Sequence, residues 1–286
     1  MINPDYQRIA EAIRFIATQS DQQPTLDEIA EHLDTSAFEI KRLFTRWSQV
    51  TPKTYLQTIT PQRGEKLLAA AKPLAEVKSQ SGLIDGMTTF GHKVQIEGWL
   101  PSFYKSGPGY DLTIEYSVHE SPFGEMFVAE TPRGICKVSF SSGLPLIAFV
   151  SNLQRLLPEA KLLRKEPEPI EIFQSIFSRD KPIDKTLNLH LFALPTHINV
   201  WRTLLATDPG TLTHHKAIAE AVGRRKSTFA THNAINSNPI AFFIPSHRAI
   251  DPSGHAGDYR WGLTRKHAIH AWECANLSVI KSPQPN

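Results

Sequence analysis

The chain has 286 residues, of which 41% are hydrophobic and 21% charged, and its formal net charge is +3. This composition is typical of globular proteins, and the length gives room for two or three domains. No apolar run approaches the roughly 18 residues that cross a bilayer, so we expect no membrane partner. The scarcity of cysteine fits a reducing compartment, and we expect a cytoplasmic location. The two cysteines are too few for a disulfide framework or a cysteine-rich zinc site, and no other pattern predicts a metal or a cofactor.

Positive charge gathers in the last third of the chain. Residues 191–286 hold ten Lys/Arg against five Asp/Glu, and eight of the 12 histidines. A basic segment of this kind is typical of a surface that contacts phosphates. A solvated basic face would have the same composition, so charge alone does not separate the two interpretations.

The first residues predict short helices. Ile9, Ile13 and Ile16 lie on one stripe of an amphipathic helix over residues 6–18. Thr25 and Ser36 each precede a glutamate by three residues, which is the spacing of a capping box.

The two helices that follow these caps are joined by a tight turn, as in a helix-turn-helix. The second helix turns Lys41, Arg42 and Arg46 outward, where they suit base edges and phosphates.

The sequence TLDEIAEHLDTSAFEIKRLFTRWSQVTPKTYL (25–56) resembles the first half of an AraC-type DNA-binding domain. That family has two such motifs, and GLIDGMTTFGHKVQIEGWLPSFYK (82–105) has the length and ending of the second. Its threonines and Gly91 fall where a firm recognition helix is expected, so this second motif is degenerate. The alternative is a helical packing module without a role in DNA binding.

Residues 111–140 show strand-like apolar runs separated by turns, and a helical stretch follows over 146–157. Alone, this pattern indicates a small α/β domain. Beside the sequence that follows it, the segment resembles the ribonuclease-H-like subdomain of the O6-alkylguanine-DNA alkyltransferases.

The sharper resemblance to that family is HINVWRTLLATDPGTLTHHKAIAEAVGRRKSTFATHNAINSNPIAFFIPSHRAI (197–250), continued by GHAGDYRWGLTRKHAIHAWE (254–273). The whole arrangement is similar to Ada-type proteins. We therefore expect a multidomain α plus α/β fold: an all-α AraC-type helix-turn-helix domain (1–105), a ribonuclease-H-like α/β subdomain (110–190) and a winged-helix-like alkyltransferase core with the DNA-binding and active-site residues (191–280).

The resemblance implies a chemistry for the core. In the family a base is rotated out of the duplex, and a thiolate, made by a histidine that a glutamate polarises, accepts the alkyl group. His247 and Glu273 match the histidine and glutamate, Asn238 the asparagine that braces the turn, and Ser246 stands where the acceptor cysteine is expected. Arg248 completes the His-Arg pair, and Tyr259 falls in the loop that covers the flipped base.

The DNA-handling positions depart from the family pattern as well. Phe229 stands where the family has an arginine finger, and His214 where it has a tyrosine. Within a DNA-contacting helix over 226–236, Phe229 shares one face with polar residues, so it acts as an apolar wedge, unless it points into the core. The other DNA contacts that we expect from this region are Arg224, Arg225, Lys226, His232 and Asn233.

The preferred function is a protein that flips and recognises alkylated or altered bases in double-stranded DNA without normal methyl transfer, alone or with other repair proteins. Three alternatives stay open: an enzyme of glycosylase type acting on a flipped base, a transcriptional regulator, and an active methyltransferase if Ser246 is an engineered replacement of cysteine. The family's tyrosine, arginine and cysteine are all replaced, at positions 214, 229 and 246. Three such replacements together favour natural divergence over the engineering of one residue.

Overall fold

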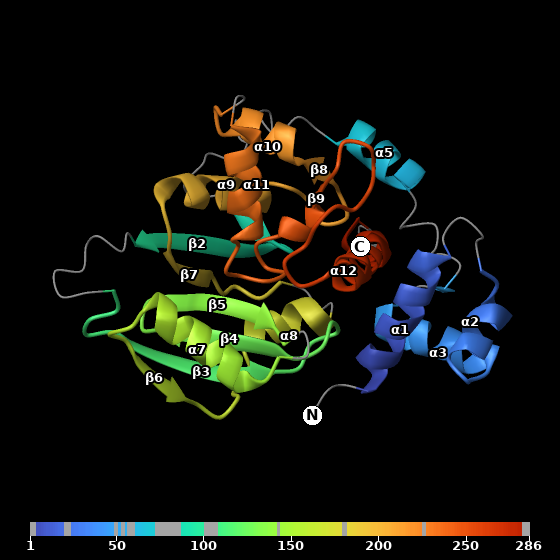
Figure 1. Cartoon of the computed structure of the whole chain (residues 1–286), viewed down its shortest axis with the longest axis horizontal. Coiled ribbons are helices and arrows are strands. Elements are labelled where there is room, and N and C mark those ends of the chain that lie inside the picture. The colour runs from blue at the N-terminus through green and yellow to red at the C-terminus, as the bar shows by residue number, and fades with distance from the viewer. Residues whose placement is uncertain are drawn as a thin grey trace, which may run out of the picture.

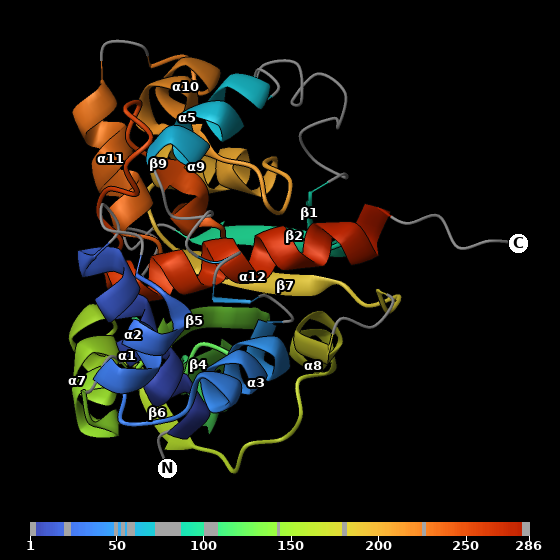
Figure 2. The ribbon, with the colours of Figure 1, turned by 90° about the vertical axis from the view of Figure 1, so that its right-hand side faces the viewer.

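The computed structural model describes residues 4–19, 24–48, 51–52, 55, 61–71, 87–99, 108–141, 144–178, 182–224 and 227–281. Helices begin the chain, a seven-stranded sheet follows, and a largely helical C-terminal part lies beside that sheet (Figure 1). Helix α5 (Pro61–Ala70) lies next to the C-terminal helices in both views (Figures 1 and 2). None of the helices in the described part of the chain is long and apolar enough to cross a membrane.

The N-terminal helices form where the sequence predicts them. Helix α1 (Pro4–Thr18) buries Ile9, Ile13 and Ile16 completely, which confirms the amphipathic stripe. Helices α2 (Leu26–His32) and α3 (Ala37–Ser48) follow, joined by residues 33–36.

The local caps explain why these two helices begin where they do. Thr25 and Glu28 form a reciprocal box, because the Glu28 amide donates to Thr25 Oγ1 (3.3 Å) and the Thr25 amide donates to Glu28 Oε2 (2.7 Å). Ser36 caps α3 by accepting from the Glu39 amide (3.2 Å). The Glu39 carboxylate is instead paired with Arg42 (2.8 Å).

The second helix-turn-helix motif, expected over 82–105, is wrong in its described part. Residues 87–99 form a hairpin of strands β1 (Thr88–Thr89) and β2 (His92–Trp99). Side chains of β2 alternate between buried and exposed from His92 to Ile96, the period of a strand rather than a helix. Strand β2 also pairs in parallel with β7 (Leu187–Phe192), so this segment joins the sheet of the α/β region.

The sheet has the strand order β1-β2-β7-β5-β4-β3-β6 and mixes parallel with antiparallel pairs. Its remaining strands are β3 (Thr113–His119), β4 (Met126–Thr131), β5 (Gly134–Phe140) and β6 (Lys161–Arg164).

Successive side chains of β4 point to opposite faces of the sheet and enter two hydrophobic clusters. Phe127 and Ala129 pack in a cluster with α7 (Leu146–Leu156), the helix predicted over 146–157. Met126 and Val128 face the other cluster, which also takes in α8 (Glu171–Ser178). The sheet is therefore covered on both faces, and the larger cluster continues into the C-terminal part.

The C-terminal part of the chain supplies the remaining elements. They are α9 (Pro195–Leu205), β8 (Thr213–His214), α10 (His215–Ala221), α11 (Thr228–Asn236), a 3-10 turn (Ser246–Arg248), β9 (Ala249–Ile250) and α12 (Leu263–Lys281).

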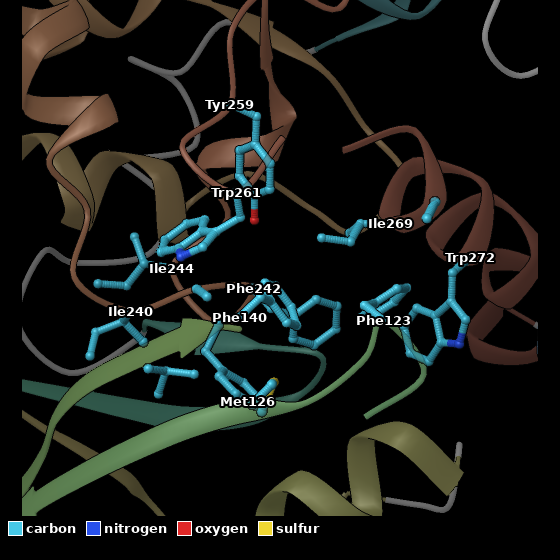
Figure 3. Close-up of a cluster of buried hydrophobic side chains, with 14 of the residues drawn as sticks. Phe123, Met126, Phe140, Ile240, Phe242, Ile244, Tyr259, Trp261, Ile269 and Trp272 are labelled. Carbon is cyan, nitrogen blue, oxygen red and sulfur yellow. The ribbon is translucent and has the colours of Figure 1, made fainter. Parts of the chain in front are cut away.

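Aromatic side chains fill the space between the sheet and α12 (Figure 3). Phe242 lies in their centre, 5.3 Å from Phe123 and 5.7 Å from Trp272 between ring centroids. The N-terminal helices dock on the same core, because Trp47 Nε1 of α3 donates to the Pro122 carbonyl (2.7 Å). Burial of large aromatic surface on this scale fixes how α12 lies against the sheet.

Candidate functional site

The turn at 245–250 is built inside the protein, not on its surface. It follows a fully buried run, Ile240–Ile244, in which each side chain is 0% exposed. The 3-10 turn then buries Ser246, His247 and Arg248, at 4%, 0% and 1% exposure. Three polar side chains without access to water need partners inside the fold.

Asn238 holds the serine in place. Its Nδ2 donates both to the Ile244 carbonyl (2.8 Å) and to Ser246 Oγ (3.0 Å), and its Oδ1 accepts from the Ile240 amide (2.9 Å). One amide side chain therefore ties the two ends of the run that leads into the turn. These bonds are compatible with the bracing role that the family resemblance implies for Asn238.

Arg248 and Glu273 form a buried, multiply bonded ion pair. Arg248 Nε lies 3.1 Å from both carboxylate oxygens, and its Nη2 donates to Oε1 at 2.7 Å. The other guanidinium nitrogen, Nη1, donates to the Thr207 carbonyl, and the Gly210 amide donates to Glu273 Oε2 (2.9 Å). Burial alone raises the pKa of Glu273, but Arg248 and His247 lower it well below its usual range, so the carboxylate is charged.

The charge on Glu273 decides the state of His247. Glu273 Oε1 lies 2.8 Å from His247 Nε2, and an ionised carboxylate only accepts, so this nitrogen carries a proton. Burial lowers the pKa of His247 more than the Glu273 carboxylate raises it, which keeps the ring neutral near pH 7. The lone pair is then on Nδ1, which is buried and has no hydrogen-bond partner among the residues that the structure describes. His247 is thus set up as an acceptor or base through Nδ1.

Tyr259 and Phe242 enclose the histidine. The Tyr259 ring stands at 90° to the His247 ring at 6.3 Å, and the Phe242 ring stacks with it at 6.0 Å. Figure 3 shows Tyr259 pointing toward this core from the loop before α12. Ser246, His247, Glu273, Asn238, Arg248 and Tyr259, predicted from separate parts of the sequence, therefore meet in one place.

Comparison with known proteins shows which family this sequence belongs to. The family model of the 6-O-methylguanine DNA methyltransferase DNA-binding domain matches residues 195–275. The bifunctional transcriptional activator/DNA repair enzyme Ada of Escherichia coli K12 is 27% identical over 94% of this chain and 75% of its own. A probable methylated-DNA–protein-cysteine methyltransferase of Acanthamoeba polyphaga mimivirus is 35% identical over 49% of this chain and 89% of its own. The chain belongs to the methylated-DNA–protein-cysteine methyltransferase family.

Among solved structures, the Mycobacterium tuberculosis O6-methylguanine methyltransferase aligns with 60% of this chain and 96% of its own, with a TM-score of 0.49 and 20% identity. The similarity to Ada extends through the N-terminal helices, so this family member is Ada-like along most of its length.

The helix predicted to contact DNA in this methyltransferase-family chain is α11. Phe229 is 78% exposed, so it does not point into the core. Asn233 is also exposed. His232 is half-buried: its ring lies 4.6 Å from the tilted His215 ring, and its Nε2 lies 2.8 Å from Asn236 Nδ2. An exposed aromatic side chain on a helix face is free to meet a partner.

The remaining predicted DNA contacts of this region are placed differently. His214 caps α10, because its Nδ1 accepts from the Ala217 amide (3.0 Å), and it is half-buried. Arg224 is exposed just before α11. Arg225 and Lys226 lie outside the described residues. Their contacts with DNA stay predictions.

The basic residues of α3 are exposed, but two of them have partners. Arg42 pairs with Glu39, and Arg46 pairs with Asp5 of α1 (2.5 Å). Lys41 is exposed, and no ion pair of its side chain is found among the described residues. The role of this helix in DNA binding also stays a prediction.

Sequence reasoning missed several residues that support the site. His270 Nε2 lies 2.5 Å from the His247 carbonyl, and Lys266 Nζ donates to the carbonyls of Ala249 (2.7 Å) and Asp258 (3.0 Å). Both precede Glu273 on α12 by multiples of a helical turn, a spacing that was visible in the sequence.

Phe90 gave no such signal. The β1–β2 turn carries it onto Phe242 (4.9 Å) and within 5.5 Å of the Arg248 guanidinium, so a segment far back in the chain lines the site. In the described part of the chain, no group of His, Cys, Asp or Glu side chains is arranged to hold a metal ion.

Proposed function

We propose that this protein binds double-stranded DNA, turns an alkylated or altered base out of the stack toward Ser246, and holds it without taking its alkyl group. The observation that carries the proposal is the Ser246 hydroxyl, fixed by Asn238 beside the neutral His247. The mimivirus relative is a probable methylated-DNA–protein-cysteine methyltransferase, a name that makes a cysteine the acceptor. Here the acceptor atom is an alcohol oxygen. The frame around it consists of five side chains: Asn238, His247, Arg248, Glu273 and Tyr259.

An alcohol is a poor acceptor in this frame. It loses its proton several pKa units less readily than a thiol, so a neutral histidine generates very little alkoxide near pH 7. Hydrogen bonding of Asn238 Nδ2 to Ser246 Oγ stabilises the oxygen but does not supply a stronger base. Methyl transfer to Ser246 is therefore lost or very slow.

Neither cysteine of the chain replaces the missing thiol. Cys136 lies in β5, donates to the Ala129 carbonyl (3.3 Å) and has a pKa raised to about 12 by burial. Cys274 follows Glu273 on α12, and a helix turns about 100° per residue, so the two side chains leave the helix in different directions. The site therefore recognises a base without an acceptor for its alkyl group.

Phe229 supports the base-turning part of the proposal. An enzyme or binding protein that reaches an atom inside a duplex extrudes the nucleotide and leaves a gap in the stack. An apolar side chain entering between base steps fills such a gap. Phe229 is exposed on α11, where that side chain is needed.

The decisive experiment compares two duplexes that differ in one O6-methylguanine. We expect tighter binding to the modified duplex, with no methyl group on the protein by intact-mass spectrometry and no free base or abasic site in the DNA. Equal affinity for the two duplexes would remove the proposal. A methyl group on Ser246 would show transfer instead, and release of a base would show a glycosylase.

Two serine variants separate the acceptor from the frame. Ser246→Cys places a thiol beside His247 and is expected to accept methyl from the modified duplex. Ser253→Cys is the matched control, since Ser253 is exposed outside the frame and its thiol should stay unmodified. Continued inactivity of Ser246→Cys would assign the loss to Phe229 and His214 as well.

A second function, control of transcription through α2 and α3, rests on a different observation. Lys41 and the 71% exposed Phe38 lie on the outer side of α3, the second helix of the pair. The Escherichia coli relative is a bifunctional transcriptional activator. Footprinting on the promoter DNA of the protein's own gene tests this: protection that Lys41→Ala abolishes supports it, and the absence of a protected sequence counts against it.

A further inference from the structure

Two neighbouring hollows lie between the sheet-bearing part of the chain (residues 108–192) and the C-terminal helices. The larger, about 500 Å³, is lined by α7, the β7–α9 connection and the residues that follow α11. The smaller, about 200 Å³, lies between β5, α7 and the Tyr259 loop. Lys137, Asn152 and Arg260 line both, so the two hollows meet at these side chains. The larger volume is in the range of pockets that bind small molecules.

The walls of both hollows are cationic. Lys137, Arg155 and Arg260 line the larger one, and no aspartate or glutamate is among the lining residues of either. In the described ranges, none of the three cations forms an ion pair. Like charges that converge without a carboxylate attract an anion into the space between them.

Lys137 makes this arrangement costly for the empty protein. Its residue is only 7% exposed, and its Nζ donates to Asn152 Oδ1 (2.9 Å). Burial lowers the pKa of Lys137 to about 8, and the positive charges of Arg260 and Arg155 act in the same direction. A buried ammonium ion is normally paired with an anion. The anion that would complete this site is not a side chain of the described part of the protein.

The position of the hollow relative to α11 bears on which anion it could hold. Ser237 and Pro239, which follow α11 directly, form part of its wall, and Arg260 follows Tyr259 of the candidate site. Figures 1 and 2 place α7 and α11 on the same side of the molecule. DNA lying along the exposed face of α11 therefore passes near Lys137, Arg155 and Arg260.

We propose that this hollow binds a backbone phosphate of the duplex, beyond the stretch contacted by α11, with Lys137, Arg155 and Arg260 as its ligands. The sheet-bearing part of the chain then shares in DNA binding instead of only supporting the C-terminal part. This inference rests on the DNA binding of the proposed function, but it requires neither base flipping nor a lesion.

The first test measures the salt dependence of binding to an unmodified duplex. Each phosphate contact contributes about 0.9 to the slope of log affinity against log salt concentration. Arg155→Gln and Lys137→Met should each reduce the slope by up to this amount and weaken binding roughly tenfold at low salt. Lys161→Gln, on the exposed edge strand β6, removes a lysine outside the hollow and should change neither quantity.

Lys137→Met keeps the length of the buried chain, and Arg155 is exposed, so at least the Arg155 variant is expected to fold as the parent protein does. Wild-type slopes in both variants would overturn the inference. Because the duplex carries no lesion, this result is separate from any failure of the proposed function, which would appear as equal affinity for modified and unmodified duplexes.

The second test locates the phosphate. Methylphosphonate groups, which are uncharged, are placed one at a time along the modified duplex. One position outside the stretch contacted by α11 should weaken binding of the wild-type protein but have no further effect on Lys137→Met. If no position behaves in this way, the hollow does not hold a backbone phosphate. If a mononucleotide binds with the same dependence on Lys137 and Arg155 while duplex binding is unchanged, the ligand is a free nucleotide and the inference is wrong.

Discussion

Replacing Arg248 by methionine should leave the Glu273 carboxylate buried without its main counter-charge. The two residues are each 1% exposed, and the guanidinium makes three contacts of 2.7–3.1 Å with the carboxylate. Breaking a buried pair from one side typically costs about 3–5 kcal/mol. For a chain of this size, about 2 °C of melting temperature is lost per kcal/mol, so Arg248→Met should melt roughly 6–10 °C lower.

Two further variants show whether the loss comes from the unpaired charge. In Arg248→Met/Glu273→Gln the remaining amide is neutral and still accepts a hydrogen bond, so part of the stability should return. Arg42→Met is the control for removing an arginine, because its pair with Glu39 has a similar distance of 2.8 Å but is exposed, and it should cost less than about 1 kcal/mol. Urea unfolding followed by fluorescence measures these three variants and the single variant Glu273→Gln. If the double variant is as unstable as the sum of its two single variants, the two side chains are not coupled and the reasoning is refuted.

Three other outcomes follow from single residues. Phe229→Ala should leave the melting temperature unchanged, because Phe229 is 78% exposed. It should weaken binding to the modified duplex by on the order of 10-fold or more, measured by fluorescence anisotropy. Unchanged affinity would rule out a wedge. Burial lowers the pKa of His267 from 6.5 to about 4, so the unfolded chain binds more protons than the folded protein below pH 6.5. About 3 kcal/mol of stability that is present above pH 6.5 should therefore be lost as the pH falls toward 4. A flat profile of unfolding free energy against pH, or one equally steep in His267→Gln, would contradict this. Cys274 is half-buried, whereas Cys136 is buried with a pKa raised to about 12. In the folded protein at pH 8, only the Cys274 thiol should react with a disulfide reagent. Rapid reaction of both thiols would contradict the burial of Cys136.

The features that could be predicted from the sequence are those fixed by near neighbours. The capping box at Thr25, the Ser36 cap and the stripe of α1 depend on residues within one or two helical turns, and the structure confirms them. The predicted box at Ser36 is only half formed, because the Glu39 carboxylate pairs with Arg42. Strand β2 lies in a segment with the length and ending of a helical motif, and its pairing with β7 is not visible locally, because Val94 pairs with Leu187, 93 residues further on. The alternation from His92 to Ile96 spans only five residues, which is too short by itself to separate a strand from a helix.

The site was predictable as a set of residues but not as a network. The motif places Ser246, His247 and Glu273 together, whereas the bonds from Thr207 and Gly210 depend on how a distant loop packs. The cationic hollow could not be predicted at all. Lys137, Arg155 and Arg260 come from a strand, a helix and a loop, and their convergence appears only when the two parts of the chain are packed together.

The buried network also decides which residues test function. Glu273 neutralises Arg248, anchors the loop at Gly210 and bonds His247, so the fold needs it whether or not any chemistry takes place. Keeping His247 and Glu273 is therefore weak evidence for catalysis, because losing either leaves a buried group unpaired. Phe229 is different, since an exposed aromatic side chain contributes little to the folded state and still has its ring turned to solvent on α11. Phe229 and the exposed Arg155 are therefore the positions where the proposed contacts with DNA can be tested without disturbing the core.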